Sequence, residues 1–155
     1  MLKWLWLSVL VVVLDQASKW VVDRSMELYE SIKLVPLFQL TYVRNTGAAF
    51  SFLAHAGGWQ RWFFIGLSMV ASVAIAFWIK RLPKGRVWEA AAWSLVLGGA
   101  LGNLIDRIAY GYVIDFLDAF YQNWHFPAFN VADSAITVGV AILLVDAALN
   151  IRHAE

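Results

Sequence analysis

Two aspartates, Asp115 and Asp133, are the residues of this chain best suited to do chemistry. Two carboxyl groups held close together cannot both ionise comfortably, so they share a proton and one pKa rises. Such a pair can act as general base and general acid towards a water molecule between them, and can hydrolyse an amide without a covalent intermediate. Two aspartates in separate segments specify little by themselves. Their meaning depends on the elements that bring them together.

Other chemistries have less support. The absence of cysteine removes disulfides, thiol nucleophiles and cysteine-based metal sites. The sequence has no HExxH zinc helix and no GxSxG elbow, and its histidines, His55, His125 and His153, are scattered. A Ser–Lys dyad would have to use Lys19, for which Asp15 is the better-placed partner. We therefore expect neither a metal nor a cofactor.

The composition is that of a membrane protein. Hydrophobic residues make up 61% of the 155 residues, and only 15% are charged, against roughly 25% in ordinary globular proteins. Mean hydropathy is +0.65, and nine tryptophans suit the interfaces of a bilayer. The net charge of +1 comes without a long basic run, so we expect no nucleic acid partner.

Four apolar segments each approach the roughly 20 residues that cross about 30 Å of hydrocarbon. They cover residues 4–22, 62–79, 88–108 and 132–151. The first is too long for the apolar region of a cleaved signal and carries charges, so we interpret it as a retained helix. The predicted fold is an all-α polytopic membrane protein, one domain over residues 1–155, with four transmembrane helices. A short strand is expected at Leu37–Arg44.

Basic residues predict the orientation. The connection 80–86 holds four of them, Lys3 precedes the first helix and Arg152 follows the last. The positive-inside rule places that side, and both termini, in the cytoplasm. The two remaining loops, 24–61 and 109–131, then face outward, and we expect the second to lie flat on the membrane interface.

Polar residues from three separate stretches converge on the outer third of the membrane. At 1.5 Å per residue, Asp15 and Lys19 lie roughly 17 and 23 Å along the first helix from Trp4. The third helix carries its polar residues at a similar depth, and the fourth begins with two more. These are Asn103, Asp106 and Arg107, then Asn130 and Asp133. Each charge in hydrocarbon costs about 2.5–3.5 kcal/mol, so these groups should face the interior of the bundle.

Several of these residues also have a structural interpretation. Asp15 and Lys19 are four residues apart, in the better order for a helical ion pair. Gly98 and Gly102 form a small-xxx-small pair that would let another helix approach closely. Asp106 is a rival for the catalytic role, unless it only pairs with its neighbour Arg107. Asp118 and Asp146 are expected to be solvated or snorkelling acids near opposite surfaces.

Five motifs along the chain resemble the lipoprotein signal peptidases (signal peptidase II) of bacteria. They occur in the order of that family and extend over nearly the whole chain. The motifs are Asp15-Gln16-Ala17-Ser18-Lys19, Asn45-Thr46-Gly47-Ala48-Ala49-Phe50, Gly98-Gly99-Ala100-Leu101-Gly102-Asn103-Leu104-Ile105-Asp106-Arg107, Val113-Ile114-Asp115-Phe116 and Phe129-Asn130-Val131-Ala132-Asp133.

The resemblance implies an aspartic endopeptidase of the bacterial cytoplasmic (inner) membrane. It would cleave prolipoproteins on the N-terminal side of a diacylglyceryl-modified cysteine, among membrane lipids, and the peptide antibiotic globomycin would inhibit it. It implies a small extracytoplasmic β-cradle and a catalytic dyad of Asp115 and Asp133. The residues expected to line the site are Asn45, Asn103, Arg107 and Asn130, and those expected to support it are Asp15, Lys19, Gly99, Asp106 and Ala132.

Two other functions stay open from the residues alone. A small proton- or ion-coupled transporter would also carry charges inside the membrane, but along the whole depth of the bundle. A structural assembly subunit would tolerate the loss of either carboxylate.

Overall fold

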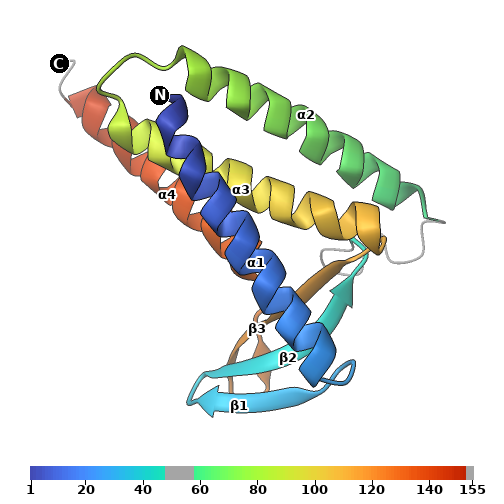
Figure 1. Ribbon diagram of the computed structural model, residues 1–155. Coiled ribbons are helices and arrows are strands. Elements are labelled where there is room, and N and C mark those ends of the chain that lie inside the picture. Colours follow the sequence, from blue (N-terminus) through green and yellow to red (C-terminus); the bar gives the residue numbers. More distant parts are fainter. Residues whose placement is uncertain (48–57, 153–155) are drawn as a thin grey trace.

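The computed structural model describes residues 1–47 and 58–152, in which four long helices form a bundle with a small sheet at one end (Figure 1). The helices are α1 (Leu5–Ser25, after a 3-10 turn at Leu2–Trp4), α2 (Trp59–Arg81), α3 (Val87–Ala109) and α4 (Val131–Arg152). The strands are β1 (Ser31–Val35), β2 (Phe38–Asn45), β3 (Val113–Tyr121) and β4 (Trp124–His125). The four predicted helices are confirmed, with ends shifted by only a few residues.

Within the described ranges, three helices are long and apolar enough to cross a membrane: α1 with its preceding turn, α2, and α4 up to Leu149. Helix α3 is as long as α2 but is not among these three. It packs against α1, α2 and α4, so protein rather than lipid surrounds much of it. A helix enclosed in this way does not need an apolar surface all round. The passage of α3 through the membrane stays a prediction.

Glycines on α3 allow the close approach of its neighbours. A methyl group at Gly98 would lie 2.9 Å from the Ser8 backbone of α1, and one at Gly102 would lie 2.6 Å from Asp15 Oδ2. A methyl group at Gly99 would lie 2.3 Å from the carbonyl oxygen of Ala132 in α4. The prediction that Gly98 and Gly102 admit another helix is confirmed, and that helix is α1.

The sheet is antiparallel, in the order β1-β2-β3-β4. The predicted strand at 37–44 is confirmed as β2. Much of the segment 114–129, which is expected to lie flat on the membrane interface, belongs to β3, which pairs with β2 and is largely buried. Its position relative to the interface stays a prediction. The small sheet that the resemblance implies is therefore confirmed, although the local sequence pattern predicts only one of its four strands. Its extracytoplasmic position stays a prediction. Phe50 and Phe52, whose place in the sequence favours contact with lipid headgroups, lie outside the described residues.

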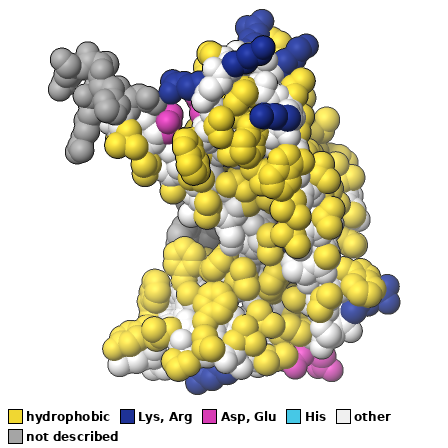
Figure 2. All heavy atoms as spheres, turned by 60° about the vertical axis from the view of Figure 1, so that its left-hand side comes forward, with side chains coloured by type: hydrophobic (Ala, Val, Ile, Leu, Met, Phe, Trp, Pro, Cys, Tyr) yellow, Lys and Arg dark blue, Asp and Glu magenta, His cyan; other side chains and the backbone are white. Residues whose placement is uncertain are grey.

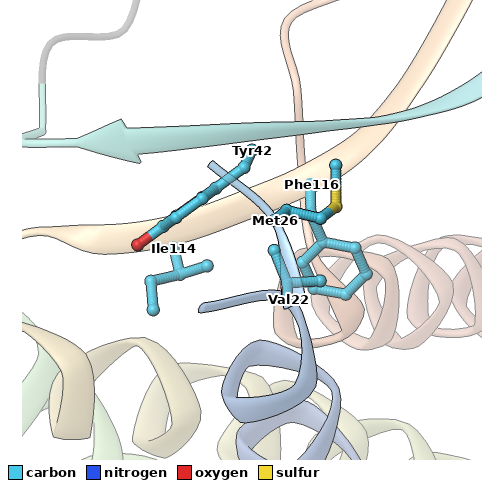
Figure 3. Close-up of a cluster of buried hydrophobic side chains, with 5 residues drawn as sticks. All are labelled: Val22, Met26, Tyr42, Ile114 and Phe116. Atoms are coloured by element: carbon cyan, nitrogen blue, oxygen red, sulfur yellow. The ribbon is translucent and has the colours of Figure 1, made fainter. Parts of the chain in front are cut away.

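A hydrophobic cluster attaches the sheet to the end of α1 (Figure 3). Val22 and Met26 of α1 pack there against Tyr42 of β2 and Ile114 and Phe116 of β3. Side chains alternate between the two faces of a strand. Because Ile114 and Phe116 face this cluster, the side chain between them, at position 115, faces the other side of the sheet.

The two ends of the bundle differ in charge. Figure 1 shows the beginning of α1, the end of α4 and the α2–α3 connection together at the end opposite the sheet. Basic side chains gather at that end, and hydrophobic side chains cover the middle of the molecule (Figure 2). Large hydrophobic side chains on α1 and α2, such as Val13, Trp62 and Val73, are more than half exposed, as expected for a surface in contact with lipid.

Candidate active site

A capping box at the start of α4 holds Asp133. The Asp133 backbone N–H donates to Asn130 Oδ1 at 2.9 Å, and the Asn130 backbone N–H donates to Asp133 Oδ2 at 3.3 Å. This reciprocal pair satisfies two N–H groups of the first helical turn and restricts both side chains. The positive end of the helix dipole favours a negative charge on Asp133. Its second oxygen, Oδ1, accepts a hydrogen bond from Asn103 Nδ2 at 2.8 Å.

Asp115 lies on β3, buried, and accepts two amide hydrogen bonds. Asn130 Nδ2 donates to its Oδ1 at 2.8 Å, and Asn45 Nδ2 donates to its Oδ2 at 3.0 Å. Asn45 ends β2, and its side-chain oxygen accepts the Gly47 N–H at 2.9 Å. Asn45 therefore shapes the turn, as its sequence context predicts, and also holds a carboxylate.

Asn103 and Asn130 join the two aspartates into one cluster. Asn130 Nδ2 donates to Asn103 Oδ1 at 3.1 Å as well as to Asp115, while Asn103 donates to Asp133. Two amide side chains therefore connect the carboxylates: Asn130 hydrogen-bonds to Asp115, and Asn103 hydrogen-bonds to Asn130 and to Asp133. Strand β3, α3 and the start of α4 meet here, so the structure brings Asp115 and Asp133 into one hydrogen-bonded cluster.

Lys19 is the centre of a second, adjoining cluster. Its Nζ lies 2.7 Å from Asp15 Oδ2 and 3.0 Å from Asp106 Oδ2, and donates to Asn103 Oδ1 at 3.1 Å. The predicted ion pair of Asp15 and Lys19 is confirmed. A lysine ammonium only donates, so it requires the oxygen of Asn103 on its own side and leaves the amide nitrogen for Asp133.

Asp15 and Asp106 connect this cluster to the elements that carry the two acids. Asp15 Oδ1 accepts the Ala132 N–H in the first turn of α4 at 2.9 Å. Asp106 Oδ2 accepts the Ile114 N–H, next to Asp115, at 3.0 Å. The supposed pairing of Asp106 with Arg107 is wrong, because the cation within ion-pair distance of Asp106 is Lys19.

The Arg107 side chain lies over an aromatic ring on the outer turn of α3. Its guanidinium is 5.1 Å from the centre of the Phe64 ring, and Nη1 lies 3.4 Å from the Asn103 carbonyl oxygen. Its positive charge acts on Asp133 and on Asp115. The cation belongs to the electrostatic surroundings of both acids.

Sequence reasoning missed two contributors, Gln16 and Arg61, and misjudged one acid outside the site, Asp118. Gln16 Nε2 donates to Asp106 Oδ1 at 2.8 Å, and its position beside Asp15 was the available signal. Arg61 of α2 donates to the last carbonyls of α3, those of Arg107 and Ile108, at 3.0 and 2.9 Å. Asp118 is no solvated acid, because it is buried among hydrogen-bond donors.

The second of these acids is partly exposed and has a cation beside it. Asp146, on α4, lies 3.6 Å from Arg86 Nη1 and is only 27% exposed. Arg86 comes directly before α3, so this ion pair joins the basic end of the bundle to α4. His55 and His153 lie outside the described residues.

Burial raises the pKa of Asp115 to about 7. The hydrogen bond from Asn45 opposes this shift, and the negative charge of Asp133 adds to it. Lys19 and the Asn130 amide act against it as well. A carboxyl group that exchanges its proton near neutral pH suits general acid–base chemistry under physiological conditions.

An apolar groove with a volume of about 460 Å³ lies beside Asp133. One wall is the segment between β4 and α4, and the other is the first two turns of α4. The lining residues are Phe126, Pro127, Ala128, Phe129, Asp133, Ser134, Thr137 and Val138. A substrate held in this groove would have one of the two acids in its wall.

Curated proteins similar to this chain are lipoprotein signal peptidases. The protein of Pseudoalteromonas translucida is 59% identical over 146 residues, which cover 94% of this chain and 88% of that protein. The protein of Alteromonas mediterranea is 54% identical over 145 residues, covering 94% of this chain and 80% of that protein. A solved bacterial membrane enzyme, 29% identical, superposes with a TM-score of 0.88 over 100% of this chain and 93% of its own.

A family model described as signal peptidase (SPase) II matches residues 7–149. These similarities give no support to an ion-coupled transporter. Peptidase chemistry needs a water-activating group, and the cluster around Asp115 and Asp133 contains two carboxylates that can serve. The chain belongs to the signal peptidase II family, whose members are membrane aspartic peptidases.

Proposed function

We propose that Asp115 and Asp133 are the catalytic pair with which this peptidase removes signal peptides from prolipoproteins. The observation that carries the proposal is their membership of one buried hydrogen-bonded cluster, joined through Asn103 and Asn130. Two carboxyl groups arranged around a shared water are sufficient to hydrolyse a peptide bond.

The environments of the two acids favour different roles. The pKa of Asp115, raised by burial to about 7, keeps this group protonated over much of the neutral range. Asp133 lies at the positive end of α4, where a carboxylate is favoured. Asp133 therefore takes a proton from the water while the oxygen of that water attacks the scissile carbonyl carbon. Asp115 gives its proton to the carbonyl oxygen.

The intermediate then breaks down with a second proton transfer. The carbon–nitrogen bond of the scissile peptide breaks, and the proton held by Asp133 passes to the leaving amine. The gem-diol returns a proton to Asp115 as the carbonyl re-forms, so both acids regain their starting states. The amides of Asn45, Asn103 and Asn130 keep the carboxylates in place, and the Arg107 charge stabilises the negative charge that develops near them.

The substrate class follows from the family and from the position of the site. We propose that the scissile bond lies on the N-terminal side of a diacylglyceryl-modified cysteine, with its acyl chains in the surrounding lipid. Such an anchor confines the substrate to the membrane and supplies part of the positioning that an enzyme in water must obtain from binding contacts. Globomycin is the expected inhibitor.

We further propose a placement in the bacterial inner membrane with four spans, α3 included. The basic end of the bundle, with both termini, lies in the cytoplasm, and the sheet and the two acids lie at the extracytoplasmic side. The positive-inside rule and the basic side chains at the end opposite the sheet support this orientation (Figure 2).

The test is to incubate the purified protein with a diacylglyceryl-modified precursor, with and without globomycin. Wild-type protein should cleave the precursor, and globomycin should stop cleavage. Asp115→Asn and Asp133→Asn should insert and fold but cleave nothing, because each keeps the side-chain shape and loses the acid. Substantial cleavage by either variant would remove the dyad assignment.

A further inference from the structure

Asp118 is the centre of a buried cluster on the sheet, one that the reaction does not use. Its side chain is 6% exposed. Gln39 Nε2 donates to Oδ2 at 2.7 Å, and Thr41 Oγ1 donates to the same oxygen at 3.1 Å. His125 Nδ1 lies 2.9 Å from Oδ2 and 3.1 Å from Oδ1. An ionised carboxylate only accepts, so His125 is the donor.

His125 is the link between this cluster and the chain that follows. It lies on β4, whose two residues pair with the end of β3. Its ring also stacks on Phe120, with centres 5.6 Å apart. A two-residue strand has little pairing of its own. The hydrogen bonds to Asp118 therefore contribute much of what holds β4 against β3.

The segment after β4 leads from this anchor to the active site. The Phe126 N–H donates to the Ala119 carbonyl oxygen at 2.8 Å, and Phe129 exchanges hydrogen bonds with Leu117. The next residue is Asn130, which caps α4 and holds Asp115. Residues 126–129 are thus fixed at one end by the Asp118–His125 pair and at the other by the catalytic cluster.

The same four residues, 126–129, form one wall of the apolar groove beside Asp133. The size of the groove favours an extended occupant. A helix 10–12 Å wide fills roughly 400–600 Å³ in a single 5.4 Å turn, about the whole of the 460 Å³ beside Asp133.

We infer that Asp118 and His125 are positioning residues that hold segment 126–129 as the wall of a groove for an acyl chain of the lipid-modified substrate. The inference rests on the proposed function. The occupant is apolar because the lining is apolar, extended because of the size of the groove, and attached to the substrate because Asp133 is in the wall. The pair acts on substrate binding through the wall and does not touch the reacting atoms.

Two substitutions of His125 separate its two contacts. His125→Asn keeps a donor near the position of Nδ1 and removes the ring, whereas His125→Phe keeps a ring for Phe120 and removes the donor. For a precursor with long acyl chains, we expect KM to rise roughly 10-fold in His125→Phe, the loss of about two methylene contacts. In His125→Asn, which keeps the donor, KM for the same precursor should stay within about twofold of the wild-type value, because no methylene contact is lost.

The dependence of KM on acyl-chain length distinguishes this role from a general weakening of the fold, which would affect short-chain and long-chain precursors alike. With short-chain precursors the KM of His125→Phe should match that of the wild type, and kcat should be preserved with both substrates. Asp118→Leu, which removes both acceptor oxygens, should reproduce His125→Phe. A control on the exposed face of β1, Ile32→Thr, should leave both constants unchanged.

Three results would overturn the inference: a wild-type KM in His125→Phe, an equal rise for short and long chains, or a fall in kcat alone. Failure of His125→Asn to restore KM would also reject it, since the donor would then not matter. The proposed function fails on a different measurement, namely cleavage by Asp115→Asn or Asp133→Asn. The two failures are therefore distinguishable.

Discussion

Asn103 lies between Lys19 and Asp133 and hydrogen-bonds to both. Its side-chain oxygen accepts from Lys19 Nζ at 3.1 Å, and its nitrogen donates to Asp133 Oδ1 at 2.8 Å. The same oxygen accepts from Asn130 Nδ2, which also donates to Asp115. A buried cation on α1 thereby determines how one amide faces the two proposed catalytic aspartates. Asn103 therefore belongs both to the cluster around Lys19 and to the cluster around Asp115 and Asp133.

Replacing Asn103 by aspartate tests that relationship. The variant keeps the shape and the oxygen that faces Lys19, but it replaces the donor to Asp133 with a like charge. We expect cleavage to fall about 100-fold or more, the scale of one lost acid–base contribution. The measurement is kcat/KM on a lipid-modified precursor. Asn103→Asp with near wild-type turnover would show that Asp133 needs no donor from α3.

Replacing Lys19 by methionine should first weaken the fold. The change leaves Asp15 and Asp106 buried without their cation, and breaking a buried pair costs about 3–5 kcal/mol. Thermal unfolding in detergent measures this loss. The double variant Lys19→Met with Asp15→Asn should recover part of it, because one uncompensated charge is removed. An unchanged melting temperature in the single variant would contradict the role given to Lys19.

Cleavage should fall as the pH rises through about 7. The pKa of Asp115 is raised by burial from 3.8 to about 7, so the protonated acid that the mechanism needs is lost above that pH. Initial rates between pH 5 and 9 measure this, at saturating substrate to report on the complex. A rate that stays flat or increases up to pH 9 would place the essential proton elsewhere.

The same shift makes a prediction for stability. Because the folded pKa lies above the ordinary value, the contribution of Asp115 to stability is fully present below about pH 3.8 and is lost as the pH rises through about 7. Asp115→Asn cannot ionise, so the wild type should lose stability relative to this variant between those pH values. Parallel thermal melts of the two proteins provide the comparison.

The sequence predicts some parts of this structure and not others for physical reasons. The helices follow from apolar length alone, and the convergence of Asp15, Asn103 and Asp133 follows from the rise per residue in a membrane of fixed thickness. The position of β3 could not be predicted in this way. Its contacts are with β2, about 70 residues earlier in the chain (Asn45 to Asp115), and no local pattern encodes such a pairing.

Asp118 shows a second limit of sequence reasoning. Its donors, Gln39, Thr41 and His125, come from β2 and β4, so its burial depends on the register of the sheet. When the register of the sheet is unknown, an acidic residue such as Asp118 in an apparent loop is predicted to be exposed to solvent. The carboxylates inside the bundle were easier to place, because a charge within a membrane helix must face protein or water.

Close packing between α3 and α4 should be necessary for activity, and two glycines offer a matched test. A methyl group at Gly99 would lie 2.3 Å from the Ala132 carbonyl oxygen, whereas one at Gly66 of α2 meets nothing within 4 Å. Gly99→Ala should cost about 1–3 kcal/mol by overpacking and reduce cleavage, because α4 can only relieve the clash by moving Asp133 away from Asn103. Gly66→Ala should be neutral or stabilise the helix by up to about 1 kcal/mol. Melting temperatures and kcat/KM of both variants decide the matter, and equal behaviour of the two would mean that the contact between Gly99 and Ala132 does not hold Asp133 in position.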